Sequence, residues 1–211
     1  MNADLSQRAS VATSTVPWSS RGGIEEKLLE DSSLQGLRRT AVLRMPPGGQ
    51  LPVIGTTGSI DLLVLEGELR DPRFVYRAGM FLHEPAGARA FHTTTGCLVL
   101  LKQRPARRVT RRALDISGVA FEVGQSPGLW NAPLHEGLDG KVVLLRFDPG
   151  TVVGPHRHDD GEEFFVLRGE VRDDHGTYRV HDWVRQPPAS VHSIESPGGC
   201  LFFTFAHHLP L

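Results

Sequence analysis

The sequence predicts an all-β protein that consists of two tandem β-barrels. Two observations support this prediction: short β-rich runs alternate with turns while helical periodicity is scarce, and the second half of the chain repeats the first. Glycine and proline together make up about 18% of the 211 residues, above the roughly 12% of an average protein. This surplus favours many turns between short strands, as in a sandwich or a barrel.

The β-rich runs and their turns can be read directly from the sequence. The best candidate for a helix, Gly23–Leu29, is too short to be stable by itself. The predicted strands are Thr40–Arg44, Ile60–Leu65, Lys141–Phe147, Glu162–Leu167 and Cys200–Phe205. The turn signals that bound them are Pro46–Gly49, Asp148–Gly150, Asp159–Gly161 and Pro197–Gly199.

An internal repeat defines the domain organisation. A shift of 102 residues aligns the two halves without a gap from residue 41 to residue 90. Matching pairs include Val64-Leu65 with Val166-Leu167, Gly67-Glu68 with Gly169-Glu170, Arg70-Asp71 with Arg172-Asp173, and Tyr76-Arg77 with Tyr178-Arg179. After one inserted residue, Cys97-Leu98 matches Cys200-Leu201. Matching turns imply matching folds, so we predict one barrel over residues 1–105 and another over residues 106–211.

The charge and the apolar runs exclude several classes of protein. With 23 basic and 24 acidic residues, the net charge is −1, so no basic surplus exists to neutralise nucleic-acid phosphates. A local basic cluster over residues 104–112 is expected to be a solvated linker or an edge strand, with a nucleic-acid patch as the alternative. No apolar run is long enough to span a bilayer, and no secretory signal opens the sequence.

The two cysteines point to a reducing compartment. Cys97 and Cys200 cannot form a disulfide framework, and they occupy equivalent strands of the two repeats. We therefore expect a cytoplasmic protein with two buried free thiols. Redox sensing through Cys200 is the alternative.

The second repeat contains a constellation of residues that suits a metal ion. His156 and His158 are two residues apart, so on a strand both imidazoles point to one face. The turn signal Asp159–Gly161 predicts a hairpin that returns Glu162 to the side of His158, and His192 follows a proline-rich turn from a third strand. Three neutral imidazoles and one carboxylate suit a divalent first-row metal and leave one or two positions open for water or a small ligand. Zinc and iron are the first candidates, and manganese and nickel are compatible.

The first repeat lacks this constellation. In the 102-residue register the four ligand positions correspond to Ile54, Thr56, Ile60 and Ala90. We predict that this half retains the fold without the metal, with a structural role or an apolar pocket. The remaining histidines have no matching spacing, so His83 and His92 are expected to be surface or internally satisfied residues.

These residues resemble the cupin family. Residues 150–169 match its first motif, G-x5-H-x-H-x3-E-x6-G, and residues 187–192 resemble its second, P-x-G-x-x-H, with Ala189 in place of glycine. His181 also stands where a glycine normally precedes. More narrowly, the chain is similar to the ChrR-like cupins, the family of the sensor domain in ChrR anti-sigma factors. The segments that carry this likeness are residues 1–8, 16–18, 161–167, 176–178 and 185–188.

The resemblance covers most of the chain and implies a fold and a role. The implied fold is two tandem cupin barrels, each a jelly roll or double-stranded β-helix, with His156, His158, Glu162 and His192 as metal ligands. The implied role is that of a metal-binding regulatory or stress-response protein. In that family an N-terminal zinc-binding module binds the sigma factor. No His-x3-Cys-x2-Cys motif precedes Cys97 here, so we do not expect this chain to bind a sigma factor in that way.

Three functions remain open from the sequence. The first is the metal-binding regulator or sensor. The second is a metal-dependent dioxygenase for a small ketone or hydroxyaryl ketone, which would use a small-molecule site in the C-terminal barrel. The third is a structural bicupin in which the metal only staples the barrel. Because Phe164–Leu167 is apolar on both faces of its strand, we also expect it to be covered on its outer side by the other repeat or by a second copy, in a homodimer.

Overall fold

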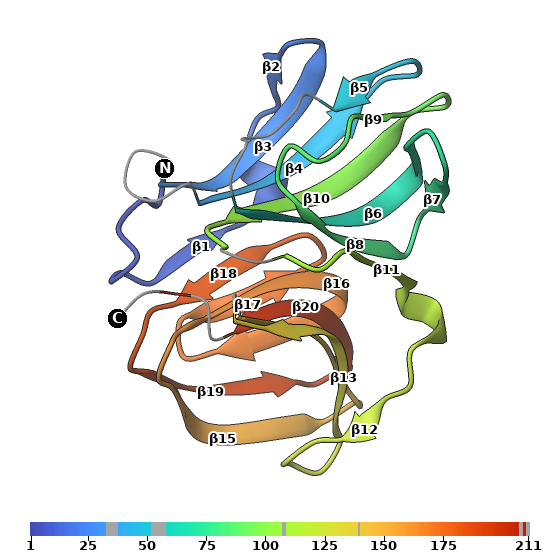
Figure 1. Ribbon diagram of the computed structural model, residues 1–211. Helices are drawn as coiled ribbons and strands as arrows, with labels where there is room; N and C mark the ends of the chain where they lie inside the picture. The colour runs from blue at the N-terminus through green and yellow to red at the C-terminus, as the bar shows by residue number, and fades with distance from the viewer. Residues whose placement is uncertain (33–37, 52–57, 107–108, 139, 207–208, 210–211) are drawn as a thin grey trace. The chain divides into compact units, whose positions relative to one another are not determined.

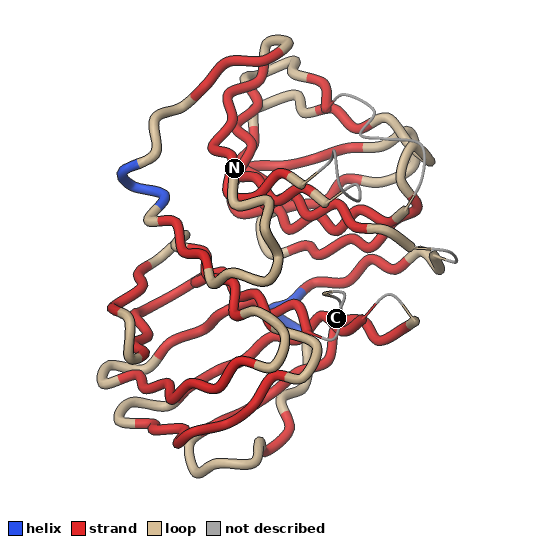
Figure 2. The backbone as a smooth tube through the Cα atoms, turned by 90° about the vertical axis from the view of Figure 1, so that its left-hand side faces the viewer, coloured by secondary structure: helices blue, strands red, loops and turns tan. Residues whose placement is uncertain are grey.

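The computed structural model describes residues 1–32, 38–51, 58–106, 109–138, 140–206 and 209. The described backbone consists almost entirely of strands and loops, with two short helical turns at Thr13–Thr15 and Ile116–Gly118 (Figure 2). Within these residues no helix has the length and apolar character needed to cross a membrane. The all-β prediction is therefore confirmed.

The chain forms two compact units. The first contains Met1–Ala3 and Pro17–Gly118, and the second contains Asp4–Val16 and Val119–Leu211. These units differ from a division between residues 105 and 106, because a short segment before each repeat folds into the sheet of the other repeat. The reason is strand pairing, which local sequence patterns do not specify.

The first unit is built from ten strands within the described residues (Figure 1). They are β2 (Ser19–Arg21), β3 (Ile24–Asp31), β4 (Arg39–Met45), β5 (Gln50–Leu51), β6 (Ser59–Arg70), β7 (Val75–Arg77), β8 (Met80–Pro85), β9 (Phe91–His92), β10 (Cys97–Arg104) and β11 (Arg112–Asp115). One layer has the order β11-β8-β6-β10-β4-β3-β2, and the other joins β5, β9 and β7 to the end of β6.

The second unit repeats this arrangement. Its described strands are β1 (Ala9–Val11), β12 (Glu122–Val123), β13 (Leu129–Gly137), β14 (Gly140–Phe147), β15 (Thr151–His158), β16 (Glu162–Asp173), β17 (Gly176–Arg179), β18 (Trp183–Gln186), β19 (Ser190–Ser196) and β20 (Cys200–Ala206). The order β1-β18-β16-β20-β14-β13-β12 matches that of the first unit strand for strand. The 102-residue repeat is therefore a repeat of topology.

The longest strand of each unit connects its two layers. In the second unit, the beginning of β16 pairs with β18 and β20, whereas its last residues pair with β17 and β19. Gly169 lies where this strand changes partners, with φ +74°, and a Cβ there would meet the carbonyl oxygen of Gly199 at 2.2 Å. Gly67 has the same role in β6 against Gly96, at 2.2 Å. The repeated Gly-Glu pair thus marks a place where only glycine fits.

Each unit encloses its own apolar core, contributed by both layers. The first includes Leu62, Val64, Tyr76, Phe91 and Val99. The second includes Phe147, Phe164, Val166, Val184 and Phe202. Phe164, Phe165 and Val166 are all fully buried, which confirms that both faces of this strand are covered.

The segment before each repeat forms an edge strand. Strand β1 pairs with β18 through Ser10 and Val184, and β11 pairs with β8 through Ala113 and Leu82. The two pairings occupy equivalent edges of the two units. The edge-strand expectation for the basic cluster is thus confirmed for Arg112.

Two other sequence expectations need correction. The segment proposed as the best helix candidate belongs to strand β3, whose residues alternate between more and less buried positions. Arg104 is not a solvated linker residue: it is buried at the end of β10, where its Nε lies 3.0 Å from a carboxylate oxygen of Asp61.

The positions of the two thiols give a testable prediction. Cys97 and Cys200 are both buried. Burial raises the pKa of Cys97 to about 11 and also raises that of Cys200. At pH 8 only about one Cys97 side chain in a thousand would then be a thiolate, the reactive form. We expect both thiols to react with a disulfide reagent orders of magnitude more slowly in native protein than in guanidinium-unfolded protein. A native thiol that reacts as fast as the unfolded one would contradict this burial and favour a redox role.

Candidate metal centre

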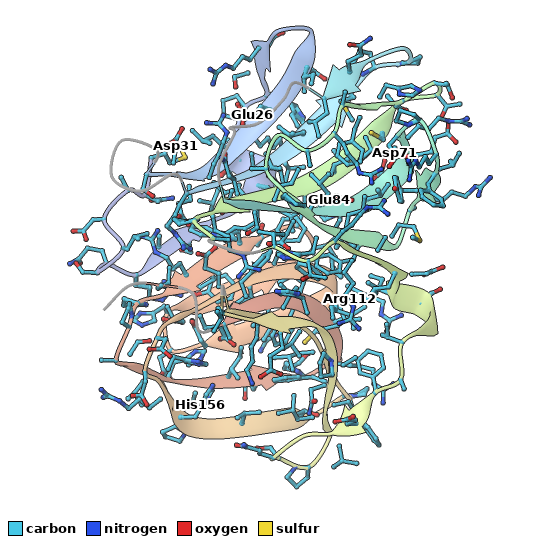
Figure 3. The ribbon with its side chains drawn as sticks, in the orientation of Figure 1. Glu26, Asp31, Asp71, Glu84, Arg112 and His156 are labelled. Atoms are coloured by element: carbon cyan, nitrogen blue, oxygen red, sulfur yellow. The ribbon has the colours of Figure 1, made fainter. Side chains whose placement is uncertain are left out.

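Three histidines of the second unit meet on two paired strands. Strand β15 pairs with β19 so that His156 lies opposite His192 and His158 lies opposite Ser190. A register shift between Val153 and His156 precedes these residues in β15. Figure 3 shows His156 at this pair of strands. The three ring nitrogens available as ligands lie within 4.8 Å of one another, the one such group found among the described residues.

The rings of His158 and His192 face each other through their Nε2 atoms, and His156 uses Nδ1 for a backbone contact. Nδ1 of His156 lies 3.0 Å from the carbonyl oxygen of Gly154, to which it donates a hydrogen bond in the tautomer that leaves Nε2 unprotonated. Nε2 of His158 lies 3.0 Å from Nε2 of His192. The ring centroids are 4.5–5.0 Å apart. Such convergence of imidazole lone pairs is the arrangement a transition-metal ion requires.

Glu162 completes the cluster, but by a different route from the predicted hairpin. It begins β16, which pairs with β18 and β20 and not with β15. The turn at residues 159–161 therefore carries the chain from one layer to the other, with Gly161 at φ +70°. The carboxylate faces the histidines across the barrel interior: its Oε2 lies 3.4 Å from Nε2 of His158 and 3.9 Å from Nε2 of His192.

These four side chains fit a divalent metal ion. The donor atoms of His158, His192 and Glu162 are separated by 3.0–3.9 Å, which matches the spacing of neighbouring ligands around one ion with bonds of about 2.0–2.2 Å. The ligand atom of His156 lies within 4.8 Å of those of the other two histidines. Three nitrogens and one carboxylate oxygen suit zinc and iron as well as manganese and nickel. His156 and His158 remain partly exposed, whereas His192 and Glu162 are buried. An ion held here would thus be reachable from solvent on the side of β15.

Burial leaves two members of the cluster, Glu162 and His192, uncharged without a metal. Burial raises the pKa of Glu162 to about 8. Burial and the nearby His156 lower the pKa of His192 to about 4. At neutral pH the carboxyl group thus keeps its proton and His192 carries no charge. A bound cation reverses this preference for the carboxyl group and displaces its proton.

A series of polar contacts begins at Nδ1 of His192, on the side of the ring away from the metal centre. The side-chain amide of Gln186 lies 3.2 Å from Nδ1 of His192 and 3.2 Å from Asp173. The same amide nitrogen faces both neighbours, so it can donate one hydrogen bond to Nδ1 of His192 and one to Asp173. Metal binding through Nε2 would place the ring proton on Nδ1, so that Gln186 would have to turn its oxygen to His192 at the expense of its hydrogen bond to Asp173. Asp173 in turn forms an ion pair of 2.9 Å with Arg8, from the segment before β1, and accepts a hydrogen bond of 2.7 Å from Tyr178.

The spacing of residues in the sequence does not reveal this set of supporting contacts. The repeated Arg-Asp and Tyr-Arg pairs contain Asp173 and Tyr178 and could have indicated it, because a polar pair retained in both halves of a repeat needs a physical reason. Arg8 could not have been found in this way, since it is 165 residues away from Asp173 in the chain. Burial itself would raise the pKa of Asp173, but the hydrogen bonds from Tyr178 and His175 and the charge of Arg8 hold it below its usual value.

The remaining sequence candidates lie elsewhere. Glu163 points away from the cluster, as expected, and accepts a hydrogen bond of 3.1 Å from Trp183. His83 is buried in the first unit with Nδ1 2.7 Å from Asp61, which confirms an internally satisfied residue. His92 is half-buried in β9 and belongs to no metal-type group of described residues.

Comparison with known proteins identifies the family. The model of the ChrR cupin-like domain matches the chain twice, over residues 6–107 and 110–210. This chain belongs to the ChrR cupin-like family. It contains two tandem cupin domains, as the repeat and the two barrels indicate. A search of curated proteins found no match.

Solved structures confirm the cupin fold across nearly the whole chain. A "putative glyoxylate induced protein" from Pseudomonas aeruginosa is 16% identical with a TM-score of 0.80, over 97% of this chain and 91% of that one. A "putative dioxygenase" from Nostoc punctiforme is 17% identical with a TM-score of 0.76, over 95% and 82%. Oxalate decarboxylase from Bacillus subtilis is 12% identical with a TM-score of 0.68, over 96% and 78%. At these identities the likeness shows the fold alone.

The departures from the second cupin motif leave the local backbone in the conformation that glycine favours. Ala189 has φ +65° and His181 has φ +71°, both in the left-handed region. The amide of Ala189 donates a hydrogen bond of 2.8 Å to the carbonyl oxygen of His158, which holds the turn beside the metal cluster. The altered residues thus keep the loop geometry at a cost in backbone strain.

Strand pairing locates the one-residue insertion near the end of the repeat. Arg70 pairs with His92 in the first domain, and its counterpart Arg172 pairs with Glu195 in the second. The difference between the two partners is 103 residues. The insertion therefore precedes His92 and Glu195, which agrees with an alignment that is ungapped as far as residue 90.

Arg89 and Ala90 flank the place of the missing histidine ligand. Counted back from the paired residues, Arg89 corresponds to His192. Counted forward from the turn in which Gly87 and Ala189 both have positive φ, Ala90 corresponds to His192, as predicted. Ile60 pairs with Glu84 as Glu162 pairs with Gln186, so Ile60 replaces the carboxylate ligand as predicted. The other two expected replacements, at positions 54 and 56, lie outside the described residues.

Removal of two histidines tests the metal centre. We expect purified wild-type protein to carry about one divalent ion per chain and the His156→Ala, His158→Ala double variant to carry almost none, because a single remaining imidazole and a carboxylate bind weakly. Elemental analysis by mass spectrometry measures both. His175→Ala removes an exposed histidine of the same domain and should leave the metal content unchanged. Full metal content in the double variant would contradict the assignment.

The left-handed residue beside the centre gives a stability prediction. Ala189→Gly relieves the strain at φ +65° and should stabilise the metal-free protein by about 0.5–1 kcal/mol, after the extra entropy of glycine in the unfolded chain. The melting temperature would rise by about 1–3 °C. Ala78→Gly, at an exposed position outside the left-handed region, should instead be neutral or destabilising. An equal change in both variants would argue against strain at this turn.

Proposed function

We propose that this protein is a metal-binding bicupin in which one divalent ion, held by His156, His158, Glu162 and His192, serves a regulatory role. The observation that carries the proposal is the convergence of three imidazoles, whose ligand atoms lie within 4.8 Å of one another, with the Glu162 carboxylate 3.4 Å from His158 and 3.9 Å from His192. The family match to the ChrR cupin-like domain supports a role in sensing.

The exposure of the cluster supports a site that responds to the surroundings. The two histidines of β15 are partly exposed, while His192 and Glu162 are buried. A small ligand can therefore reach an ion from one side, while the buried pair and the polar contacts from Gln186 to Arg8 hold it from the other. Three imidazoles and one carboxylate leave one or two coordination positions for such a ligand.

The same open positions favour a second candidate, a metal-dependent dioxygenase for a small ketone or hydroxyaryl ketone. The structural likeness to the Nostoc protein described as a "putative dioxygenase" agrees with this candidate at the level of fold. If the protein is such a dioxygenase, a bound iron ion would supply the redox chemistry. This chain would hold the ion through its four ligands and orient His192 through Gln186.

Oxygen consumption distinguishes the two candidates. The protein is loaded anaerobically with ferrous iron, mixed with a panel of small diketones and hydroxyaryl ketones, and followed with an oxygen electrode. The regulatory proposal expects no consumption above that of the double variant His156→Ala, His158→Ala. Saturable, substrate-dependent consumption that is lost in that variant would overturn the regulatory proposal in favour of the enzyme.

A further inference from the structure

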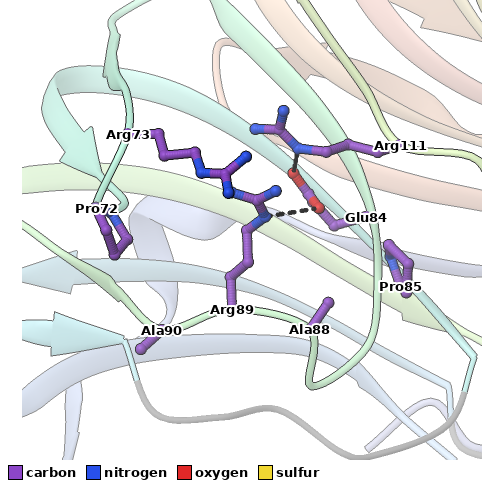
Figure 4. A pocket seen from close by; sticks show the side chains of 8 residues that line it. All are labelled: Pro72, Arg73, Glu84, Pro85, Ala88, Arg89, Ala90 and Arg111. Carbon is purple, nitrogen blue, oxygen red and sulfur yellow. Dashed lines mark hydrogen bonds and ion pairs between the residues drawn. The ribbon is translucent and has the colours of Figure 1, made fainter.

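The first cupin domain contains a pocket at the place where its metal ligand is replaced. The pocket has a volume of about 530 Å³ and is lined by Pro72, Arg73, Glu84, Pro85, Ala88, Arg89, Ala90 and Arg111 (Figure 4). This volume lies within the roughly 300–1,000 Å³ of small-molecule sites. Glu84 corresponds to Gln186 beside the metal centre, and Arg89 and Ala90 flank the place of His192.

Three guanidinium groups converge on this pocket. Figure 4 shows the carboxylate of Glu84 joined to Arg89 and Arg111, with the side chain of Arg73 also lining the pocket. The three arginines come from three separate parts of the chain: the turn after β6, the loop before β9 and the segment before β11. Such a gathering of arginines is costly unless anions balance it, because like charges at close range repel one another.

Two buried carboxylates, those of Asp71 and Glu84, balance these charges from the protein interior. Asp71 lies 2.6 Å from Nη1 of Arg89, and Glu84 contacts both Arg89, at 3.6 Å, and Arg111. The side chains of Asp71 and Glu84 are 0% and 2% exposed, whereas those of Arg89 and Arg111 are 25% and 31% exposed. The guanidinium groups are therefore exposed to a ligand in the pocket, whereas the carboxylates that pair with them are buried.

Asp71 fixes the floor of the pocket. Burial by itself would raise its pKa, but hydrogen bonds from the backbone of Arg73 and Phe74, from Tyr76 and from Arg89 lower it to about 2. Asp71 is thus ionised at neutral pH and holds Arg89 in place. Arg111 is oriented in turn by Glu84 and by the hydroxyl of Tyr76.

We propose that this pocket of the first cupin domain binds a small organic carboxylate through Arg73, Arg89 and Arg111. Guanidinium groups recognise carboxylates through paired, charge-assisted hydrogen bonds. The rest of the lining is apolar, with Pro72, Pro85, Ala88 and Ala90, which suits a carbon skeleton better than an inorganic ion. The domain has therefore replaced a cation site with an anion site on the same strands.

Calorimetric titration of succinate into the double variant His156→Ala, His158→Ala tests the proposal. This background removes the metal centre, so that a carboxylate cannot bind to a metal ion in the second domain, and a failure here leaves the metal proposal untouched. We expect saturable binding of about one succinate per chain and no binding of the uncharged analogue succinamide.

Substitutions in the same background assign the site. Arg73→Gln removes an exposed guanidinium and should weaken succinate binding about tenfold or more. Arg89→Lys keeps the positive charge over Asp71 but loses the planar fork, and should also weaken binding. Arg77→Gln removes an exposed arginine of β7 outside the pocket and should leave the affinity unchanged. Circular dichroism checks that each variant is folded.

Several results would overturn the proposal. These are the absence of saturable succinate binding, unchanged affinity in both Arg73→Gln and Arg89→Lys, and an equal loss in Arg77→Gln, which would indicate general electrostatic attraction. Binding of inorganic phosphate without binding of succinate would also overturn it, since the site would then select an inorganic anion and not an organic carboxylate.

Discussion

A buried ion pair between an aspartate and a distant arginine organises both cupin domains. In the second domain Asp173 contacts Arg8, Tyr178 and Gln186, and so connects the segment before β1 to strands β16, β17 and β18. In the first domain Asp71 contacts Tyr76 and Arg89 in the same way, with Arg111 3.6 Å away. A buried carboxylate without such partners would be strongly destabilising, so the surrounding strands must keep their positions around it.

The two domains differ at the position of His192, near this buried carboxylate, and this difference bears on what each domain can bind. In the second domain the position holds His192, a neutral ring whose lone pair can join those of two further histidines. In the first domain Arg89, a permanent cation that pairs with Asp71, lies beside the corresponding position. The two domains share their strand order but not these side chains, so the proposed cation site and the proposed anion site would use the same scaffold.

The sequence predicted much of the fold and of the metal site. The repeat identified two barrels, and the spacing of His156, His158 and His192 identified three residues that the structure brings within ligand distance of one another. Glu162 was also predicted, although for a different reason: a turn signal shows that the chain reverses, but not whether the next strand pairs with the previous one or with another layer. The role of the neighbouring Arg89 could not be predicted, because only the fold brings Asp71 to its side chain.

The sequence by itself determined the all-β class, the repeat and the residue types of the metal site, because these follow from composition and from spacing along the chain. Only the tertiary structure decided which segments belong to which unit, since the edge strands β1 and β11 pair with partners far away in the chain. It also decided the support of His192 by Gln186 and Asp173 and the gathering of three arginines in the first domain. Such contacts join residues through strand register and layer packing, and neither is encoded in a local pattern.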